Sequence, residues 1–139
     1  MSEKRVPIRA GLLSEPLTEL DQVRLLGSHC EECQETTLGT NSACPNCGSS
    51  RLRSGPLSSE GTLYTYTVVR YRPPGDYKGP DPFQPFALGL VELPEGLRVM
   101  VPIDGDPATI RIGMPLRFRA FVRPGAAAPS EVVSFAFHV

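Results

Sequence analysis

Hydrophobic and polar positions alternate strictly along residues 61–69, a stretch that contains many β-branched and aromatic residues. A period of two is typical of a β-strand that buries one face, and these residue types favour strands. We expect four further strands at residues 86–93, 97–103, 116–122 and 132–138. The turn Pro94-Glu95-Gly96 between the second and third strands has hairpin length.

Five antiparallel strands between residues 56 and 139 suggest a small closed β-barrel. The OB-fold is the leading candidate for this barrel, and a flat two-layer sandwich is the alternative. The chain is therefore predicted to be mostly β, in three parts: an N-terminal arm with a short helix at residues 1–22, a metal-binding ribbon at 23–55 and the OB-fold domain at 56–139.

The N-terminal part carries one helix signal. Ser14 is a candidate N-cap, and Pro16 would stand in the first turn, where proline is favoured. Leu17, Leu20 and Val23 would then share one face. So short a helix is marginal alone, so it needs a surface for its leucines, either on the protein's own body or on a partner.

All four cysteines fall between residues 30 and 47, as two C-x-x-C pairs separated by ten residues. Each pair offers two sulfurs on a tight turn, and two such turns close a tetrahedral thiolate cage of the kind that structural zinc prefers. Cys30, Cys33, Cys44 and Cys47 are therefore the predicted ligands of one zinc ion. A closed four-sulfur site has no open position for a substrate, so the ion would be structural.

Disulfides, redox chemistry and iron binding are alternative uses of these cysteines. No signal peptide precedes them, which favours a reducing compartment over two disulfides, and a redox-active C-x-x-C usually occurs singly. Rubredoxin-type iron fits the same cage, but redox irons are tuned by an apolar shell, and no aromatic residue precedes Tyr64. His29 adjoins Cys30 and is a candidate spare ligand.

Composition sets the broad class of the protein. The chain has 139 residues, is 40% hydrophobic and contains no apolar run long enough to span a membrane. Its 15 prolines and 13 glycines indicate many turns, and a formal charge of −1 provides no net attraction for polyanions. We expect a cytoplasmic protein.

One connection stands out. Residues 70–85 form a sixteen-residue segment with five prolines, and loops of this length in compact domains are usually functional or disordered. The segment offers apolar aromatic faces and phosphate-seeking cations, so we expect either a surface loop or a loop that contacts a ligand or a partner, through Arg70, Tyr71, Arg72, Tyr77, Lys78 and Phe83.

No residue pattern describes a self-sufficient active site. The only histidines are His29 and His138, and nucleophile-elbow, Walker and dinucleotide motifs are absent. Single-stranded nucleic acid is an alternative ligand, because OB-folds bind it and Arg117 and Arg119 share a strand face. Residues 56–123 hold eight basic and seven acidic residues, however, and this balance disfavours a polyanion.

Several motifs resemble one known family. They are the two C-x-x-C pairs, the second within C-P-x-C-G, then G-T-L-Y-T-Y-T at 61–67, F-A-L-G-L-V-E-L-P-E-G-L-R-V at 86–99 and I-G-M-P at 112–115. Together they are similar to the acyl-CoA-associated family, long catalogued as a domain of unknown function. The resemblance covers roughly residues 23–122. It implies a rubredoxin-like zinc ribbon followed by an OB-fold, with the four cysteines as zinc ligands.

The resemblance also implies a function. Members resemble non-catalytic partners of thiolase-superfamily enzymes, among them acetoacetyl-CoA thiolase assemblies, phloroglucinol acetyltransferases, steroid side-chain aldolases and benzoylsuccinyl-CoA thiolase. Such a subunit docks on the catalytic dimer and helps to shape the site for the CoA moiety. Two features differ from the family: Gln34 stands where glycine is usual, and residues 16–22 replace an aromatic-rich helix. A nucleic-acid module and a rubredoxin-like electron carrier remain the alternative functions.

Overall fold

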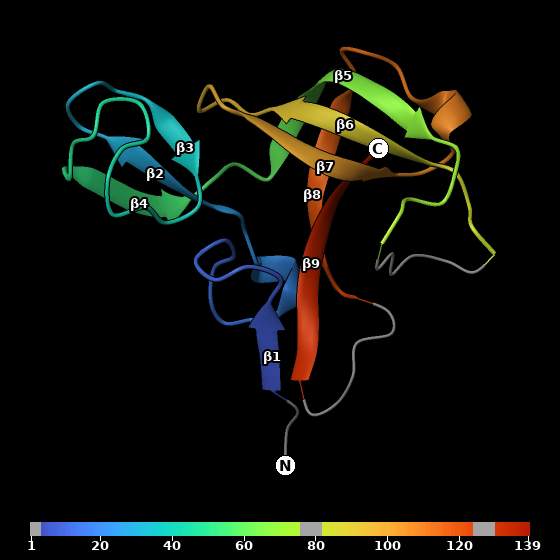
Figure 1. The fold of residues 1–139 in the computed structure, drawn as a ribbon, viewed down its shortest axis with the longest axis horizontal. Helices are drawn as coiled ribbons and strands as arrows, with labels where there is room; N and C mark the ends of the chain where they lie inside the picture. The colour runs from blue at the N-terminus through green and yellow to red at the C-terminus, as the bar shows by residue number, and fades with distance from the viewer. Residues whose placement is uncertain (1–3, 76–81, 124–129) are drawn as a thin grey trace.

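The structure is a computed structural model, and it describes residues 4–75, 82–123 and 130–139. Its strands form two sheets, one of six strands and one of three (Figure 1). The strands are β1 (Lys4–Pro7), β2 (Leu26–Cys30), β3 (Thr36–Leu38), β4 (Leu52–Pro56), β5 (Glu60–Val69), β6 (Phe86–Glu92), β7 (Arg98–Asp104), β8 (Pro115–Val122) and β9 (Ser130–His138). Two short 3-10 helices, η1 (Leu20–Gln22) and η2 (Pro107–Thr109), complete the described elements.

Five strands close a barrel. The hydrogen-bonded order runs β5, β6, β7, β9 and β8, and β8 pairs again with β5. All of these pairings are antiparallel except β7 with β9, which join through Ile103–Phe137 and Asp104–His138. The predicted five-stranded closed barrel is confirmed, and the flat sandwich is excluded, because every barrel strand has two neighbours.

The barrel interior follows from the alternation along its strands. In β7, Val99, Val101 and Ile103 are buried while the residues between them face outward. Leu63, Val91 and Phe137 are also fully buried. Removing a side chain of this size from water contributes about 1.5–3 kcal/mol, so each of these buried residues stabilises the barrel.

The predicted N-terminal helix is wrong. Ser14 does not cap a helix, because its N–H donates to the Arg24 carbonyl (2.9 Å) and its Oγ accepts from the Arg24 N–H (2.8 Å). Leu12 accepts in turn from the N–H of Leu26 at 2.8 Å, so residues 12–14 lie beside 24–26 as a short antiparallel pair. In residues 4–30 only the three residues of η1 are helical, and no α-helix occurs in the ranges described above.

The N-terminal arm is nevertheless an ordered part of the barrel's surroundings. β1 extends the large sheet by pairing in parallel with the first half of β9 (Figure 1). Arg5 forms an ion pair with Glu131 at 3.0 Å. Leu17 and Val23 are buried in the same hydrophobic cluster as the barrel core. The protein's own body therefore buries two of the three residues of the predicted helix face, and Leu20 packs against the same cluster.

The ribbon is the three-stranded sheet β3-β2-β4 and lies beside the barrel (Figure 1). Leu25 and Leu57, which flank β2 and β4 in sequence, are buried in the shared hydrophobic cluster. Gly27 leaves space for this contact, since a Cβ there would come within 2.6 Å of a Leu57 methyl carbon. Among the described residues, no helix is long and apolar enough to cross a membrane.

Candidate metal centre and contact surfaces

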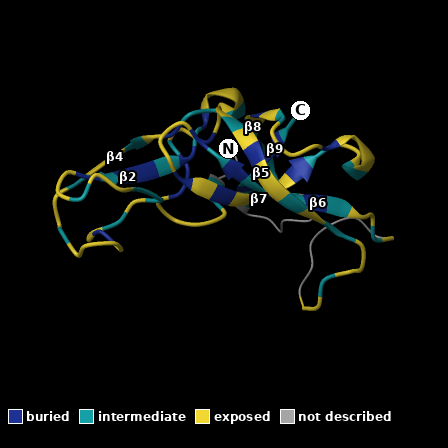
Figure 2. Ribbon diagram, turned by 90° about the horizontal axis from the view of Figure 1, so that it is seen from above, coloured by how far each residue is buried: buried dark blue, intermediate teal, exposed yellow. Residues whose placement is uncertain are grey.

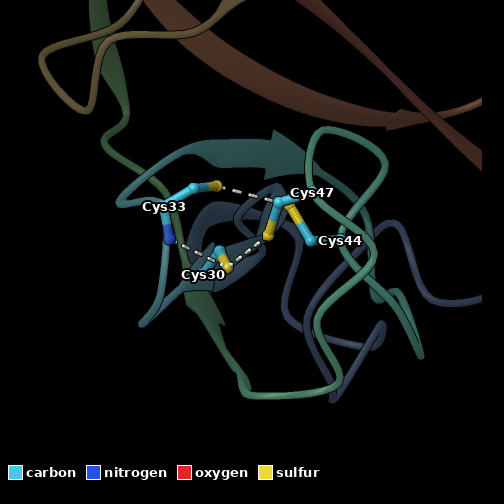
Figure 3. Close-up of side chains that lie close together, drawn as sticks. All are labelled: Cys30, Cys33, Cys44 and Cys47. Carbon is cyan, nitrogen blue, oxygen red and sulfur yellow. Dashed lines mark hydrogen bonds between the residues drawn. The ribbon is translucent and has the colours of Figure 1, made fainter.

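Two similar turns bring the four cysteines together. Cys30 ends β2 and Cys33 follows three residues later, while Cys44 and Cys47 stand in the connection that precedes β4. The turns close in the same way, since Gln34 N–H donates to the Cys30 carbonyl (3.0 Å) and Gly48 N–H donates to the Cys44 carbonyl (2.8 Å). The side chains point into the space between the two turns (Figure 3).

The sulfur spacing fits a metal ion. All four Sγ atoms lie within 4.8 Å of one another, and the Cys30–Cys47 and Cys33–Cys44 pairs are each 3.6 Å apart. Four sulfurs held tetrahedrally at zinc-type bond lengths are separated by about 3.8 Å, whereas a disulfide joins sulfurs at about 2.05 Å. The cysteines are free thiols, and their arrangement could hold one metal ion.

Nitrogen donors surround the sulfurs. Backbone N–H groups of Cys33 and Asn46 lie 3.4 Å from the sulfurs of Cys30 and Cys44, and the Asn46 side-chain amide lies 3.4 Å from the Cys33 sulfur. Asn46 therefore links the two turns. Donors of this kind orient ligands and favour their charged form. Sequence reasoning overlooked Asn46, although its place inside C-P-x-C was visible.

These contacts separate the thiol pKa values. The Asn46 side-chain donor, assisted by backbone donation, lowers the pKa of Cys33 to about 6. Backbone donation from Cys33 likewise lowers the pKa of Cys30. A backbone donor at Ser49 favours the Cys47 thiolate, but desolvation and the three other sulfurs together raise its pKa to about 12. One part of the cluster is therefore ready to bind a cation as thiolate at neutral pH.

Gln34 occupies a backbone conformation that normally favours glycine. Its φ is +67°, close to the +80° of Gly48 at the matching position of the second turn. Its side chain is held in place, because the amide nitrogen donates to the Glu31 carbonyl (3.0 Å) and the amide oxygen lies 3.1 Å from His29 Nε2. The departure from the family's glycine therefore leaves the turn intact.

His29 does not complete the metal site. Its Nδ1 lies 2.9 Å from the Thr36 hydroxyl and its Nε2 lies 3.1 Å from the Gln34 amide oxygen, so both ring nitrogens are already bonded. The donor set is four sulfurs. Such a set, closed on itself, can hold a structural ion but provides no position for a substrate.

The described ends of the predicted contact loop lie at one end of the barrel. Arg70, Tyr71 and Arg72 are exposed where β5 ends, and Tyr71 is 85% accessible. Phe83 approaches the other end of the loop, with its ring edge-to-face against Phe86 at 6.2 Å. Tyr77 and Lys78 lie outside the described residues. The loop connects β5 to β6 and belongs to the barrel, whereas the cysteines belong to the ribbon.

The arginines suggested for nucleic-acid binding are engaged with acidic partners. Arg119 donates twice to the Asp104 carboxylate, at 2.7 and 2.9 Å, and Arg117 lies 4.0 Å from Glu60. A 710 Å³ groove beside Glu60 and Arg117 is lined mainly by apolar groups and contains no histidine or cysteine. Neither feature supplies a basic track for a nucleic acid or a nucleophile with its base.

The barrel matches the domain of a known protein family. Residues 55–122 match the family model described as the C-terminal OB-fold domain of ChsH2. The chain belongs to the DUF35 family. The predicted resemblance to the acyl-CoA-associated family is thereby confirmed.

Several DUF35 relatives have descriptive names. The chain is 33% identical over 96 residues to a DUF35 domain-containing scaffold protein of Pyrococcus furiosus, covering 68% of this chain and 66% of the relative. It is 28% identical over 88 residues to the benzoylsuccinyl-CoA thiolase subunit BbsA of Thauera aromatica, covering 63% of this chain and 56% of the relative. It is 43% identical over 61 residues to a 3-oxo-4,17-pregnadiene-20-carboxyl-CoA hydratase alpha subunit of Mycobacterium tuberculosis, covering 43% of this chain and 18% of the relative.

A solved structure has the same fold. It is described as Ltp2-ChsH2(DUF35) aldolase, with a TM-score of 0.63 and 26% identity, over 83% of this chain and 84% of that chain. The chain is thus homologous to subunits of thiolase, hydratase and aldolase complexes that act on CoA substrates. It spans two thirds or less of the three named relatives.

Proposed function

We propose that this protein is a non-catalytic DUF35 subunit that docks on and completes a thiolase-superfamily enzyme acting on acyl-CoA thioesters. The observation that carries the proposal is the OB-fold domain at residues 55–122, which it shares with subunits named for thiolase, hydratase and aldolase complexes. Those names point to acyl groups of the aromatic or steroid type. The partner is a catalytic subunit of thiolase, acyltransferase or aldolase activity, and the complex is cytoplasmic.

The metal in this proposal is one structural zinc ion held by Cys30, Cys33, Cys44 and Cys47. Four thiolates without an open position suit zinc, and the ribbon has only short strands with which to hold its fold. Zinc is favoured over redox iron because polar groups surround the cluster and Cys47 is exposed, whereas redox irons are tuned by an apolar shell. Metal analysis of the purified protein tests this: one zinc per chain and no visible colour are expected, and stoichiometric iron with a coloured protein refutes it.

The CoA moiety is a second proposed contact, through the loop at 70–85. Arg72 stands exposed at its start, and a guanidinium pairs well with phosphate through its planar fork. In the assembled enzyme, Arg72→Ala with Lys78→Ala is expected to weaken CoA binding, while Arg53→Ala in the ribbon leaves it unchanged. CoA binding equal to wild type in the double variant would remove this assignment without touching the docking role.

The docking role is tested by affinity purification from cells that naturally contain the protein, followed by mass spectrometry. A thiolase-superfamily subunit that stays bound in high salt is the expected result, and its co-expression with this chain should yield a complex of defined mass. Recovery of nucleic acid or of a redox enzyme instead would refute the proposal. The paired Arg117 and Arg119 argue against the nucleic-acid alternative.

A further inference from the structure

The outer surface of β5, β6 and β7 carries an ordered set of side chains. The strand register aligns them in two rows of three, Thr65–Leu90–Met100 and Thr67–Leu88–Pro102. We call these six residues the β5–β7 face. Their alternate neighbours on β6 and β7, such as Gly89 and Val101, point into the barrel core.

This face is more apolar than the solvent-exposed face of an antiparallel sheet usually is. An antiparallel sheet with one wet face normally presents polar residues outward, yet β6 is apolar on both faces along Phe86–Val91. Leu88 and Leu90 are half-buried and Met100 is 68% exposed. Figure 2 shows the outcome, with exposed and buried positions alternating along β7 beside the half-buried positions of β6. A 240 Å³ groove lies on this surface, lined by residues that include Leu88, Leu90 and Met100.

Charge is distributed unevenly around the barrel. None of the six residues of the β5–β7 face is charged. The next outward row of β6 and β7 is charged, because the ion pair of Arg98 with Glu92 borders the face there. The outward positions of β8 and β9 carry more charge, at Arg117, Arg119 and His138, with Glu60 and Asp104 beside them. Depletion of charge and enrichment in methionine mark the centre of protein interfaces, and contiguous exposed apolar surface marks contact sites.

The face continues into the loop at the barrel's end. A third cross-strand pair, Val69 with Phe86, extends the two rows toward the exposed Arg70 and Tyr71. An apolar surface thus ends in arginine and tyrosine, residue types that often anchor interfaces. A partner that covers it needs an apolar patch bordered by acidic side chains.

We propose that the β5–β7 face is the surface on which the catalytic subunit docks, with acidic groups of that subunit opposite Arg70. This inference rests on the proposed function and names its contact surface. A nucleic acid is a poor occupant, because the six residues of the face include no cation for phosphates and no aromatic ring for bases, and Arg70 and Tyr71 lie only at its border.

The test uses the full chain and the catalytic subunit recovered with it. Met100→Glu places a charge at an exposed position of the face, so it should leave the barrel folded but weaken the complex at least about 30-fold, as expected for a central interface position. Leu90→Lys should act in the same direction. Val139→Glu is the matched control, since Val139 is 65% exposed, lies outside the face and undergoes the same change of charge. The affinity of this variant for the catalytic subunit should stay within about twofold of that of wild type.

A measurement on the wild-type protein complements the variants. Met100 should oxidise readily with peroxide in the free chain and be protected in the complex. If Met100→Glu and Leu90→Lys bound the catalytic subunit as tightly as wild type, and Met100 were oxidised equally fast in the complex, the β5–β7 face would not be the docking surface. The docking role itself would stand. Failure of the wild-type chain to bind any thiolase-superfamily subunit would overturn both proposals. A wild-type homodimer that Met100→Glu dissolves would show a second copy of this chain to be the occupant instead.

Discussion

Gly61 opens the motif G-T-L-Y-T-Y-T, and the structure explains why a glycine stands there. A Cβ at this position would lie 2.6 Å from a Val91 methyl carbon, 2.9 Å from the Glu92 carbonyl oxygen and 3.0 Å from a Leu93 methyl carbon. The carbonyl belongs to the paired strand β6, so it cannot move without disturbing the β5–β6 ladder. Gly61→Ala should therefore destabilise the barrel.

The magnitude follows from two opposing effects. Forcing an extra carbon into a packed interior costs typically 1–3 kcal/mol, and replacing glycine by alanine regains about 0.4–1 kcal/mol through the unfolded chain. The net loss is about 1–2 kcal/mol. For 139 residues the unfolding entropy is about 0.3 kcal/mol per kelvin, so Tm should fall by about 3–7 °C.

Thermal unfolding of the metal-loaded protein, followed by circular dichroism, measures this shift. Gly55→Ala in β4 is the control, because a Cβ there meets nothing within 4 Å and the position lacks a positive φ. Its Tm should match or slightly exceed that of wild type. If Gly61→Ala were as stable as Gly55→Ala, the close contact would not be what excludes a side chain from position 61.

Three further predictions concern the ribbon. Asn46→Ala removes the amide donor to the Cys33 sulfur and should weaken metal retention about 10- to 100-fold in a competition with a chelator. The control is Asn41→Ala, which should retain the metal as wild type does, because the Asn41 amide donates to a threonine hydroxyl and not to a sulfur. Equal retention in the two variants would refute the linking role of Asn46. In metal-free protein at pH 7, Cys33 should be alkylated faster than Cys47, although Cys47 is the more exposed thiol, and mass spectrometry of tryptic peptides measures both rates; faster alkylation of Cys47 would refute this. Because the folded pKa of Cys33 is about 6 against 9 unfolded, the stability that its thiolate contributes is complete above pH 9 and is lost as pH falls through 6. Gln34→Val should lower Tm by several degrees, because a β-branched residue is strained at a φ of +67°, whereas Gln34→Gly should leave Tm close to that of wild type. A higher Tm for Gln34→Val than for Gln34→Gly would contradict this reasoning.

The failed helix shows where local reasoning stops. Ser14, Pro16 and three spaced apolar residues satisfied every local rule for a short helix. In the structure two hydrogen bonds join Ser14 to Arg24, ten positions further along the chain, and hold this segment in an extended pairing instead. The apolar residues are buried as expected, but through a tertiary contact that no local pattern encodes, because a helix this short has little stability of its own to oppose it.

Features that depend on neighbours along the chain could be read from the sequence alone. Strict alternation located β5, strand-forming residues between turn signals located the other four barrel strands, and the spacing of two C-x-x-C pairs grouped the four sulfurs, because strand pleat and turn geometry act over a few residues. Features that depend on distant partners are seen only in the folded structure. It paired β1 and β7 with β9, engaged Arg117 and Arg119 with acidic groups, and brought uncharged residues from three strands onto one face. Those outcomes are set by register and closure, which a linear pattern does not contain.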